Sequence, residues 1–199
     1  MIKKLKFNKM ESLNCKTMRT IAFTLLMFLT LSLNAQVKFL GIPVDGPRSE
    51  MIHSLTQKGY IFNNYKDYLM GEFNGDDVFI HIEEYKGKVG RIIVEDATPS
   101  NEIDIIIKYN NLIEQFEKNG KYIGDNVKID NRTNISYEMA HNHNRFEAVY
   151  YQKSVDDKVL DESELYNRKV WFMMQRANQG YKILIYYDNV SNIPNGEDL

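Results

Sequence analysis

Two histidines separated by a single residue, His141 and His143, are the first residues of this sequence that could do chemistry. On a β-strand, side chains two residues apart lie on one face, so the pair could bind a transition-metal ion. A catalytic zinc site usually has three protein ligands, however, and the only further histidines are His53 and His81. A polar hairpin tip explains the segment without a metal. We favour that interpretation and expect no cofactor.

Acidic residues form adjacent pairs near the ends of predicted strands. The pairs are Asp76-Asp77, Glu83-Glu84 and Glu95-Asp96. Two carboxylates held ~5–9 Å apart across a cleft could hydrolyse a glycosidic bond. Adjacent acids are far more often solvated, however, and the acidic segment 153–167 is likewise predicted to be a solvated loop. We therefore expect no catalytic residue, and we keep an exported hydrolase, acting through carboxylates or a histidine-bound metal, as the alternative.

A single tryptophan among many other aromatic residues indicates a binding surface. Trp171 lies between Val170 and Phe172 in a predicted strand. If these two neighbours face the core, Trp171 and Met173 face the opposite side of the sheet. Such a surface is typical of a partner-binding site, unless both sheet faces are buried, one under a helix and one against the other half of the chain. The predicted binding residues, for a protein or a glycan partner, are Trp171, Met173, Tyr186 and Tyr151.

Helices and short strands are expected to position these residues. Pro47 suits the first turn of a helix over about 47–58. Thr98 is a candidate N-cap, and Pro99 a candidate first residue, for a second helix over about 99–118. Alternating apolar residues and turn dipeptides predict strands near 60–64, 68–74, 77–84, 88–95, 121–124, 134–141, 144–152, 168–176 and 180–188.

The order of these elements repeats once along the chain. Each helix is followed by a Gly-Tyr or Lys-Tyr step and then by antiparallel hairpins, in residues about 38–97 and about 98–199. The sequence thus predicts an α+β fold of two helix-plus-antiparallel-sheet units, in which each helix covers one sheet face. An internal duplication would explain the repeat, and so would a chance similarity between two α+β units.

Residues 1–35 have the order of a secretory signal peptide, namely basic, then apolar, then small residues. Their apolar run, residues 21–33, has no charge and is shorter than the ~20 residues of a spanning helix. We expect cleavage after Ala35 and an exported product, the single domain 36–199, in the periplasm or secreted. Residues 1–17 could lie upstream of a later start, and the alternative to a signal is an uncleaved anchor or a buried helix.

Removal of the signal would leave an acidic chain. Residues 1–35 hold six of the 25 basic and one of the 27 acidic residues, so residues 36–199 carry a formal charge of −7. Such a chain is not expected to bind nucleic acid, and no membrane span is expected in the mature form. The single cysteine, Cys15, is removed with the signal, which suits an oxidising compartment.

Three stretches of the chain are distinctive: KFLGIPVDG at 38–46, RFEAVYY at 145–151 and YYDN at 186–189. They resemble small exported proteins of Gram-negative gut anaerobes, an uncharacterised family. The order of helices and hairpins is also similar to the tandem units of the beta-lactamase inhibitor protein. The resemblance implies a fold and carries over no catalytic residue. We therefore expect a non-catalytic binding or envelope-accessory protein of unknown partner.

Overall fold

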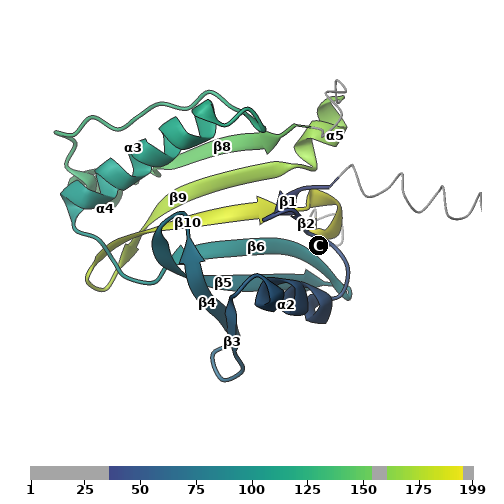
Figure 1. The fold of residues 1–199 in the computed structure, drawn as a ribbon. Coiled ribbons are helices and arrows are strands. Elements are labelled where there is room, and N and C mark those ends of the chain that lie inside the picture. Colours follow the sequence, from purple (N-terminus) through teal and green to yellow (C-terminus); the bar gives the residue numbers. More distant parts are fainter. Residues whose placement is uncertain (1–35, 154–160, 195–199) are drawn as a thin grey trace, which may run out of the picture. The chain divides into compact units, whose positions relative to one another are not determined.

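An antiparallel sheet of eight strands organises the chain from Gln36 onward, in a computed structural model that describes residues 36–153 and 161–194 (Figure 1). The strand order is β3-β4-β5-β6-β10-β9-β8-β7. The strands are β3 (Ile61–Asn63), β4 (Tyr68–Phe73), β5 (Asp76–Tyr85), β6 (Lys88–Asp96), β7 (Tyr122–Ile123), β8 (Glu147–Gln152), β9 (Lys169–Ala177) and β10 (Gly180–Asp188). A separate hairpin, β1 (Lys38–Phe39) and β2 (Ile42–Pro43), precedes them. The predicted α+β class with antiparallel strands is confirmed.

The two halves of the chain meet at the middle of this sheet. Strands β3 to β6 follow helix α2 (Arg48–Gln57), and strands β7 to β10 follow helix α3 (Glu102–Lys118). The last strands of the two halves, β6 and β10, pair with each other in the register Ile185↔Val94. The two predicted units therefore share one continuous sheet.

Both long helices pack on the same face of the sheet (Figure 1). Helix α2 buries Met51 and Leu55. The buried stripe of α3 consists of Ile105, Ile106, Tyr109, Leu112, Ile113 and Phe116. Alternate residues of the central strands, such as Ile80, Val94 and Ile185, face the helices and are buried. One face of the sheet thus holds the hydrophobic core.

Aromatic rings fill the core beneath α3. Phe116 stacks on Tyr150 of β8 with 4.6 Å between ring centroids, and Tyr109 meets the edge of Phe172 on β9 at 5.1 Å. Phe39 of β1 is fully buried and packs into the same core. Each large apolar side chain of this kind contributes ~1.5–3 kcal/mol by leaving water. These contacts fix which face of the sheet the helices cover.

The predicted strand over 134–141 is wrong, because these residues form helix α4 (Ile135–His141). Asn134 is its N-cap, and its side chain accepts a hydrogen bond from the backbone N–H of Tyr137. Ile135 is buried and Met139 is half-buried, and a spacing of four residues places both on one side of a helix. Together with Tyr137, they also occupy every second position from 135 to 139, which is why the sequence predicted a strand.

Helix α3 begins at Glu102 rather than near residue 99. Its N-cap is Asn101, whose side chain accepts hydrogen bonds from the backbone N–H groups of Ile103 and Asp104. The preceding residue, Ser100, forms a backbone bridge with Tyr181 of β10, so the chain remains extended up to the cap. The helix predicted over about 47–58 is confirmed as α2.

The structure contains two further short helices that the sequence analysis did not predict. Helix α5 (Glu162–Tyr166) lies within the acidic segment predicted to be a loop, and the 3₁₀ helix η2 (Val190–Asn192) follows β10. Residues 154–160 of that acidic segment and the predicted signal peptide, residues 1–35, lie outside the described residues.

Candidate functional site

The face of the sheet that points away from α2 and α3 is the candidate site, and we call it the open face. Cross-strand register places His81, Ile93, Tyr186, Trp171 and Val149 in one row across β5, β6, β10, β9 and β8. Each of these side chains remains partly exposed, and none belongs to the buried core. Neither long helix covers this row, because both bury their apolar residues on the opposite face.

Two aromatic rings stack at the centre of the open face. The rings of Trp171 on β9 and Tyr186 on β10 lie 4.0 Å apart between centroids, with 7° between their planes. The hydroxyl of Tyr186 donates to Sδ of Met173 at 3.9 Å. Rings that stack between neighbouring strands stand upright on the sheet. The pair therefore presents ring edges, and not ring faces, to its surroundings.

A cation lies over each of the two rings. The guanidinium carbon of Arg91 is 5.4 Å from the ring centroid of Tyr186, and Nζ of Lys169 is 5.2 Å from that of Trp171. Because each ring uses one face for the other ring, we place the two cations on the outer faces. Each such contact is typically worth ~0.5–1 kcal/mol at an exposed site. These four side chains form a layered unit that we call the aromatic stack.

One carboxylate holds the aromatic stack in place. Asp188 accepts hydrogen bonds from Nε and Nη2 of Arg91 at 2.6 and 3.1 Å, and from the indole N–H of Trp171 at 2.8 Å. The side chain of Asp188 is only 5% exposed. Its hydrogen bond is the main cause that raises the pKa of Arg91 above the ordinary value. Trp171 is therefore fixed both by its ring faces and by its N–H group.

A second ion cluster lies on the same face. Glu95 accepts a hydrogen bond from Nζ of Lys182 at 2.6 Å and lies 3.0 Å from Nε2 of His81. Lys182 also lies over the ring of Phe79, at 5.7 Å from its centroid. Arg91 pairs with Asp188, and Lys182 pairs with Glu95, so opposite charges are paired at two places on the open face. Between them, the central surface presents aromatic ring edges.

The structure brings together the residues that the sequence predicted for binding. Tyr186 contacts both Trp171 and Met173. Tyr151 lies on the same face, opposite Lys169 in the β8–β9 register, and so borders the aromatic stack. All four predicted side chains are half-buried. The sequence argument from alternating positions placed Trp171 and Met173 on one face, and the strand registers add Tyr186 and Tyr151 to that face. Their role in binding stays a prediction.

The two histidines that were weighed as metal ligands, His141 and His143, lie at the end of a helix and not on a strand or at a hairpin tip. His141 is the last residue of α4, and its ring lies 4.8 Å from that of Tyr137. His143 has a left-handed backbone with φ of 54°, so the two histidines do not alternate along a strand. Within residues 36–153 and 161–194, no group of three or more His, Cys, Asp or Glu side chains could hold a metal ion.

Adjacent acids also separate in the structure, because neighbouring residues of a strand point to opposite faces. Glu95 belongs to the open face, whereas Asp96 lies on the helix-covered face, where it binds Nζ of Lys108 at 2.7 Å. Asp76 binds the same ammonium group at 2.9 Å. These carboxylates are engaged in ion pairs, so the pattern of adjacent acids gives no support to a hydrolase.

The two cations of the aromatic stack and the carboxylate that holds it were missed by the sequence analysis. Arg91, Lys169 and Asp188 also lie at alternating positions of predicted strands, so their face could be inferred from the two-residue period. Their meeting depends on the β6–β10 and β9–β10 registers, in which Asp188 lies opposite both Arg91 and Lys169. Periodicity within one strand carries no information on such registers.

In comparisons with known proteins, no family model, curated protein or solved structure matches the chain. Among the helices of residues 36–153 and 161–194, none is long and apolar enough to cross a membrane.

Proposed function

We propose that residues 36–199 are an exported, non-catalytic binding protein whose open face contacts a protein partner. The observation that carries this proposal is the preorganised aromatic stack at the centre of that face. Trp and Tyr supply a large contact area with few rotatable bonds, and the partners of Trp171 already restrict its rotation. Such residues, clustered centrally, typically dominate the binding energy of an interface.

A protein partner suits this surface better than a glycan. Sugar rings are commonly bound by lying flat on an exposed aromatic face, but both faces of Trp171 and Tyr186 are occupied by each other and by cations. The upright edges, together with Met173 and Val149, instead offer an apolar strip bordered by paired ions. Protein interfaces have this composition, with an apolar aromatic centre and a polar rim.

Export rests on the sequence pattern of residues 1–35, and the core supports the same boundary. Val37 is fully buried, and its carbonyl accepts a hydrogen bond from the N–H of Val44. Cleavage after Ala35 would leave this buried residue in the product. The N-terminal sequence of the exported protein should therefore begin at Gln36, and a start at Met1 or Met18 would contradict export by cleavage.

The repeated order of helix and four strands is consistent with an internal duplication.

Site-specific photo-crosslinking tests the binding proposal. Gln175 and Glu147 are exposed residues of the open face, and Glu117 is an exposed residue of α3. A photo-reactive amino acid would replace each in turn in cells that make the protein, and adducts would be identified by mass spectrometry. We expect one protein adduct at Gln175 or Glu147, none of that mass at Glu117, and its loss in Val149→Lys at unchanged melting temperature.

The identity of the adduct decides between the remaining occupants of the open face. A heterologous protein whose crosslinking depends on Val149 supports the proposal. An adduct between two copies of this chain would replace it with a homodimer, and an adduct that carries only glycan would replace it with a lectin. Equal crosslinking from all three positions, or none from the open face, would refute it.

A further inference from the structure

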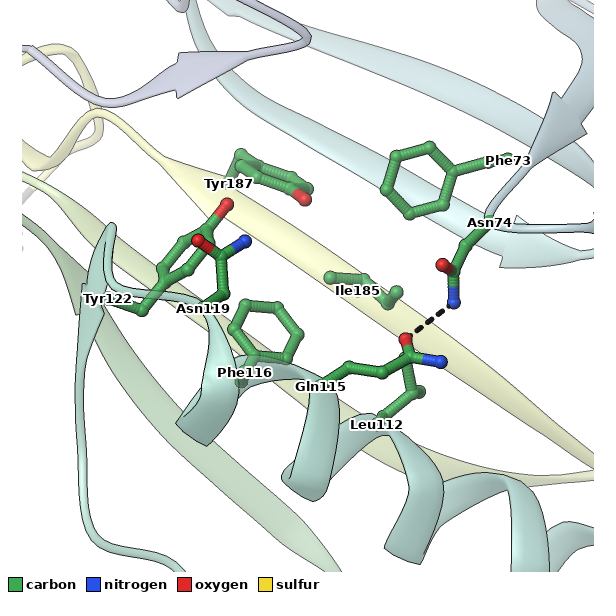
Figure 2. A pocket seen from close by; sticks show the side chains of 9 residues that line it. All are labelled: Phe73, Asn74, Leu112, Gln115, Phe116, Asn119, Tyr122, Ile185 and Tyr187. Atoms are coloured by element: carbon green, nitrogen blue, oxygen red, sulfur yellow. Dashed lines mark hydrogen bonds between the residues drawn. The ribbon is translucent and has the colours of Figure 1, made fainter.

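A groove runs along α3 on the helix-covered side of the sheet, and so it is independent of the open face. One part of it is a hollow of about 120 Å³ between α3 and the turn that joins β4 to β5. Figure 2 shows aromatic rings around this hollow, with Ile185 of β10 as part of its floor. The rings are those of Phe73, Phe116, Tyr122 and Tyr187. A cavity of similar size, about 150 Å³, accommodates one benzene ring in another protein.

A second hollow continues the groove toward the N-terminus of α3. Its volume is about 410 Å³, and it shares Asn74, Leu112 and Gln115 with the lining of the first. The side chain of Asn74 donates to Oε1 of Gln115 at 2.7 Å, and this bridge marks the boundary between the two hollows (Figure 2). The groove therefore has an aromatic end and a polar end on either side of an amide pair.

Carboxamide side chains follow one edge of this groove at a regular spacing. Asn111 and Gln115 of α3, and Asn119, the C-cap residue that follows it, are spaced four residues apart and line the two hollows. Four residues of an α-helix advance ~6 Å. Two residues of an extended chain advance ~6.6 Å, so successive carboxamides match the repeat of backbone groups along an extended peptide.

These carboxamides have hydrogen-bonding groups to spare. Gln115 uses its oxygen for Asn74, and Asn119 uses its oxygen for the N–H of Lys121. Within the described residues, the amide nitrogens of Gln115 and Asn119 have no acceptor, and Asn111 has no partner. Each can donate to a peptide carbonyl, and Asn111 can also accept from a peptide N–H.

The polar end of the groove carries negative charge. Asp76 and Asp104 line the second hollow, and Asp96 lies beside them under Lys108. Burial opposes the charge of Lys108, but its hydrogen bonds to Asp96 and Asp76 outweigh that effect and raise its pKa. The ammonium group of Lys108 pairs with Asp76 and Asp96, and Asp104 adds a third carboxylate to the lining. The formal charge of this end is therefore −2, which favours a cationic side chain in the occupant.

We infer that this groove binds an extended peptide segment with an aromatic side chain in the first hollow and a basic side chain in the second. Phe116 lies eight positions after Lys108 in α3, which corresponds to ~12 Å along the helix. An extended peptide covers that distance in about four residues, and residues four apart point to the same side. The ligand class is therefore an aromatic and a basic residue with three residues between them.

Fluorescence anisotropy with two blocked, labelled peptides tests this inference. The probes are Phe-Ser-Ser-Ser-Lys and Lys-Ser-Ser-Ser-Phe, because the groove does not fix the chain direction. We expect one of them to bind saturably, and its Phe→Ser analogue to bind at least about tenfold more weakly, as expected for losing a buried ring. A Lys→Glu analogue should bind about fivefold more weakly at low salt, because the groove is negative.

A matched pair of variants locates the binding to the groove. Gln115 and Glu117 are both exposed residues of α3, but only Gln115 lines the hollows. Gln115→Trp should cover the aromatic hollow and weaken binding at least about tenfold. Glu117→Trp should change it less than about twofold, and both variants should keep the wild-type melting temperature and the crosslinks of the open face.

Other results would overturn the inference. If neither peptide binds saturably, or if the two variants bind equally, the groove is not a peptide site. If N-acetylphenylalaninamide binds as tightly as the better peptide, the hollow is a site for small aryl amides and the polar end does not contribute. Because the open face lies on the other side of the sheet, none of these failures bears on the proposed protein partner.

Discussion

Trp171 shows how a single residue can belong both to a sheet and to a binding surface. Its ring faces contact Tyr186 and Lys169, and its N–H group is held by Asp188. A side chain with that many partners contributes to stability even though no helix covers it. The sequence analysis left two possibilities for Trp171, core residue or surface residue, and its half-buried position combines features of both.

Two substitutions at Trp171 should separate these contributions. Trp171→Phe keeps a stacked ring and removes the N–H···Asp188 bond, so the free energy of unfolding should fall by about 1–2 kcal/mol. Trp171→Ala also removes the stack and should cost about 3 kcal/mol. Urea unfolding curves measure both. Tyr65→Ala is the control, since a fully exposed ring should matter by less than about 0.5 kcal/mol. Equal costs for Phe and Ala would contradict the stack.

At the scale of elements, one ion cluster ties α3 to three strands. Lys108 projects from the helix to Asp96 of β6 and Asp76 of β5, and the second oxygen of Asp96 accepts a hydrogen bond from the N–H of Ile183 on β10. The side chain of Asp96 is 8% exposed, so its charge depends on these partners. The cluster therefore fixes the position of the helix along the sheet.

Removal of the ammonium group should be costly for that reason. Lys108→Met keeps the apolar stem but leaves Asp96 with one hydrogen bond, and we expect a loss of about 2–3 kcal/mol in urea unfolding. Lys118→Met is the matched control in the same helix, because Lys118 is 78% exposed and its bond to Glu114 lies at the surface. Its cost should stay below about 0.5 kcal/mol. Similar costs for both variants would show that the cluster does not anchor α3.

The start of α3 gives a second test at this scale. Asn101 provides two hydrogen bonds to the first turn, whereas Thr98 is exposed and lies outside the helix. Asn101→Ala should therefore destabilise the protein by about 1 kcal/mol. Thr98→Ala, the cap expected from sequence, should have an effect within about 0.5 kcal/mol. A larger cost for Thr98→Ala than for Asn101→Ala would instead support a helix that begins near residue 99.

Most elements were predictable, and the failures have a common cause. Strands β5, β9 and β10 each bury three or four apolar residues at alternate positions, so their two-residue period is unambiguous. Residues 134–141 contain few apolar residues, and these fit both a two-residue and a four-residue step. The cap at Asn134 decided the outcome in favour of α4. Short segments of this kind are fixed by local hydrogen bonds that periodicity does not register.

At the scale of the whole molecule, the pairing of β6 with β10 could not be predicted from the sequence. Each half supplies its own hairpins, but nothing in the sequence of either half specifies that their last strands pair. That pairing creates the open face, because it brings Arg91 of one half against Asp188 of the other. It also creates the core, in which Val94 and Ile185 meet under the helices.

Core tyrosines of α3 and β10 predict how the whole fold responds to alkali. Burial raises the pKa of Tyr109 to about 12, with smaller contributions from Tyr150 and Glu147. Burial, together with the neighbouring Tyr122, raises the pKa of Tyr187 well above its ordinary value. In an unfolded chain both hydroxyls would ionise near pH 10. Above that pH the unfolded state therefore binds fewer protons than the folded state.

The sign of the pH dependence follows from this difference. Below pH ~10 these two groups should cause no change of the free energy of unfolding with pH. The free energy of unfolding should then fall steadily as the pH rises from ~10 to ~12. Urea unfolding at a series of pH values measures the slope. Tyr109→Phe should reduce this slope by the contribution of one proton. A stability that stays level up to pH 12 would contradict the burial of Tyr109 and Tyr187, and with it the packing of α3 and β10 in a common core.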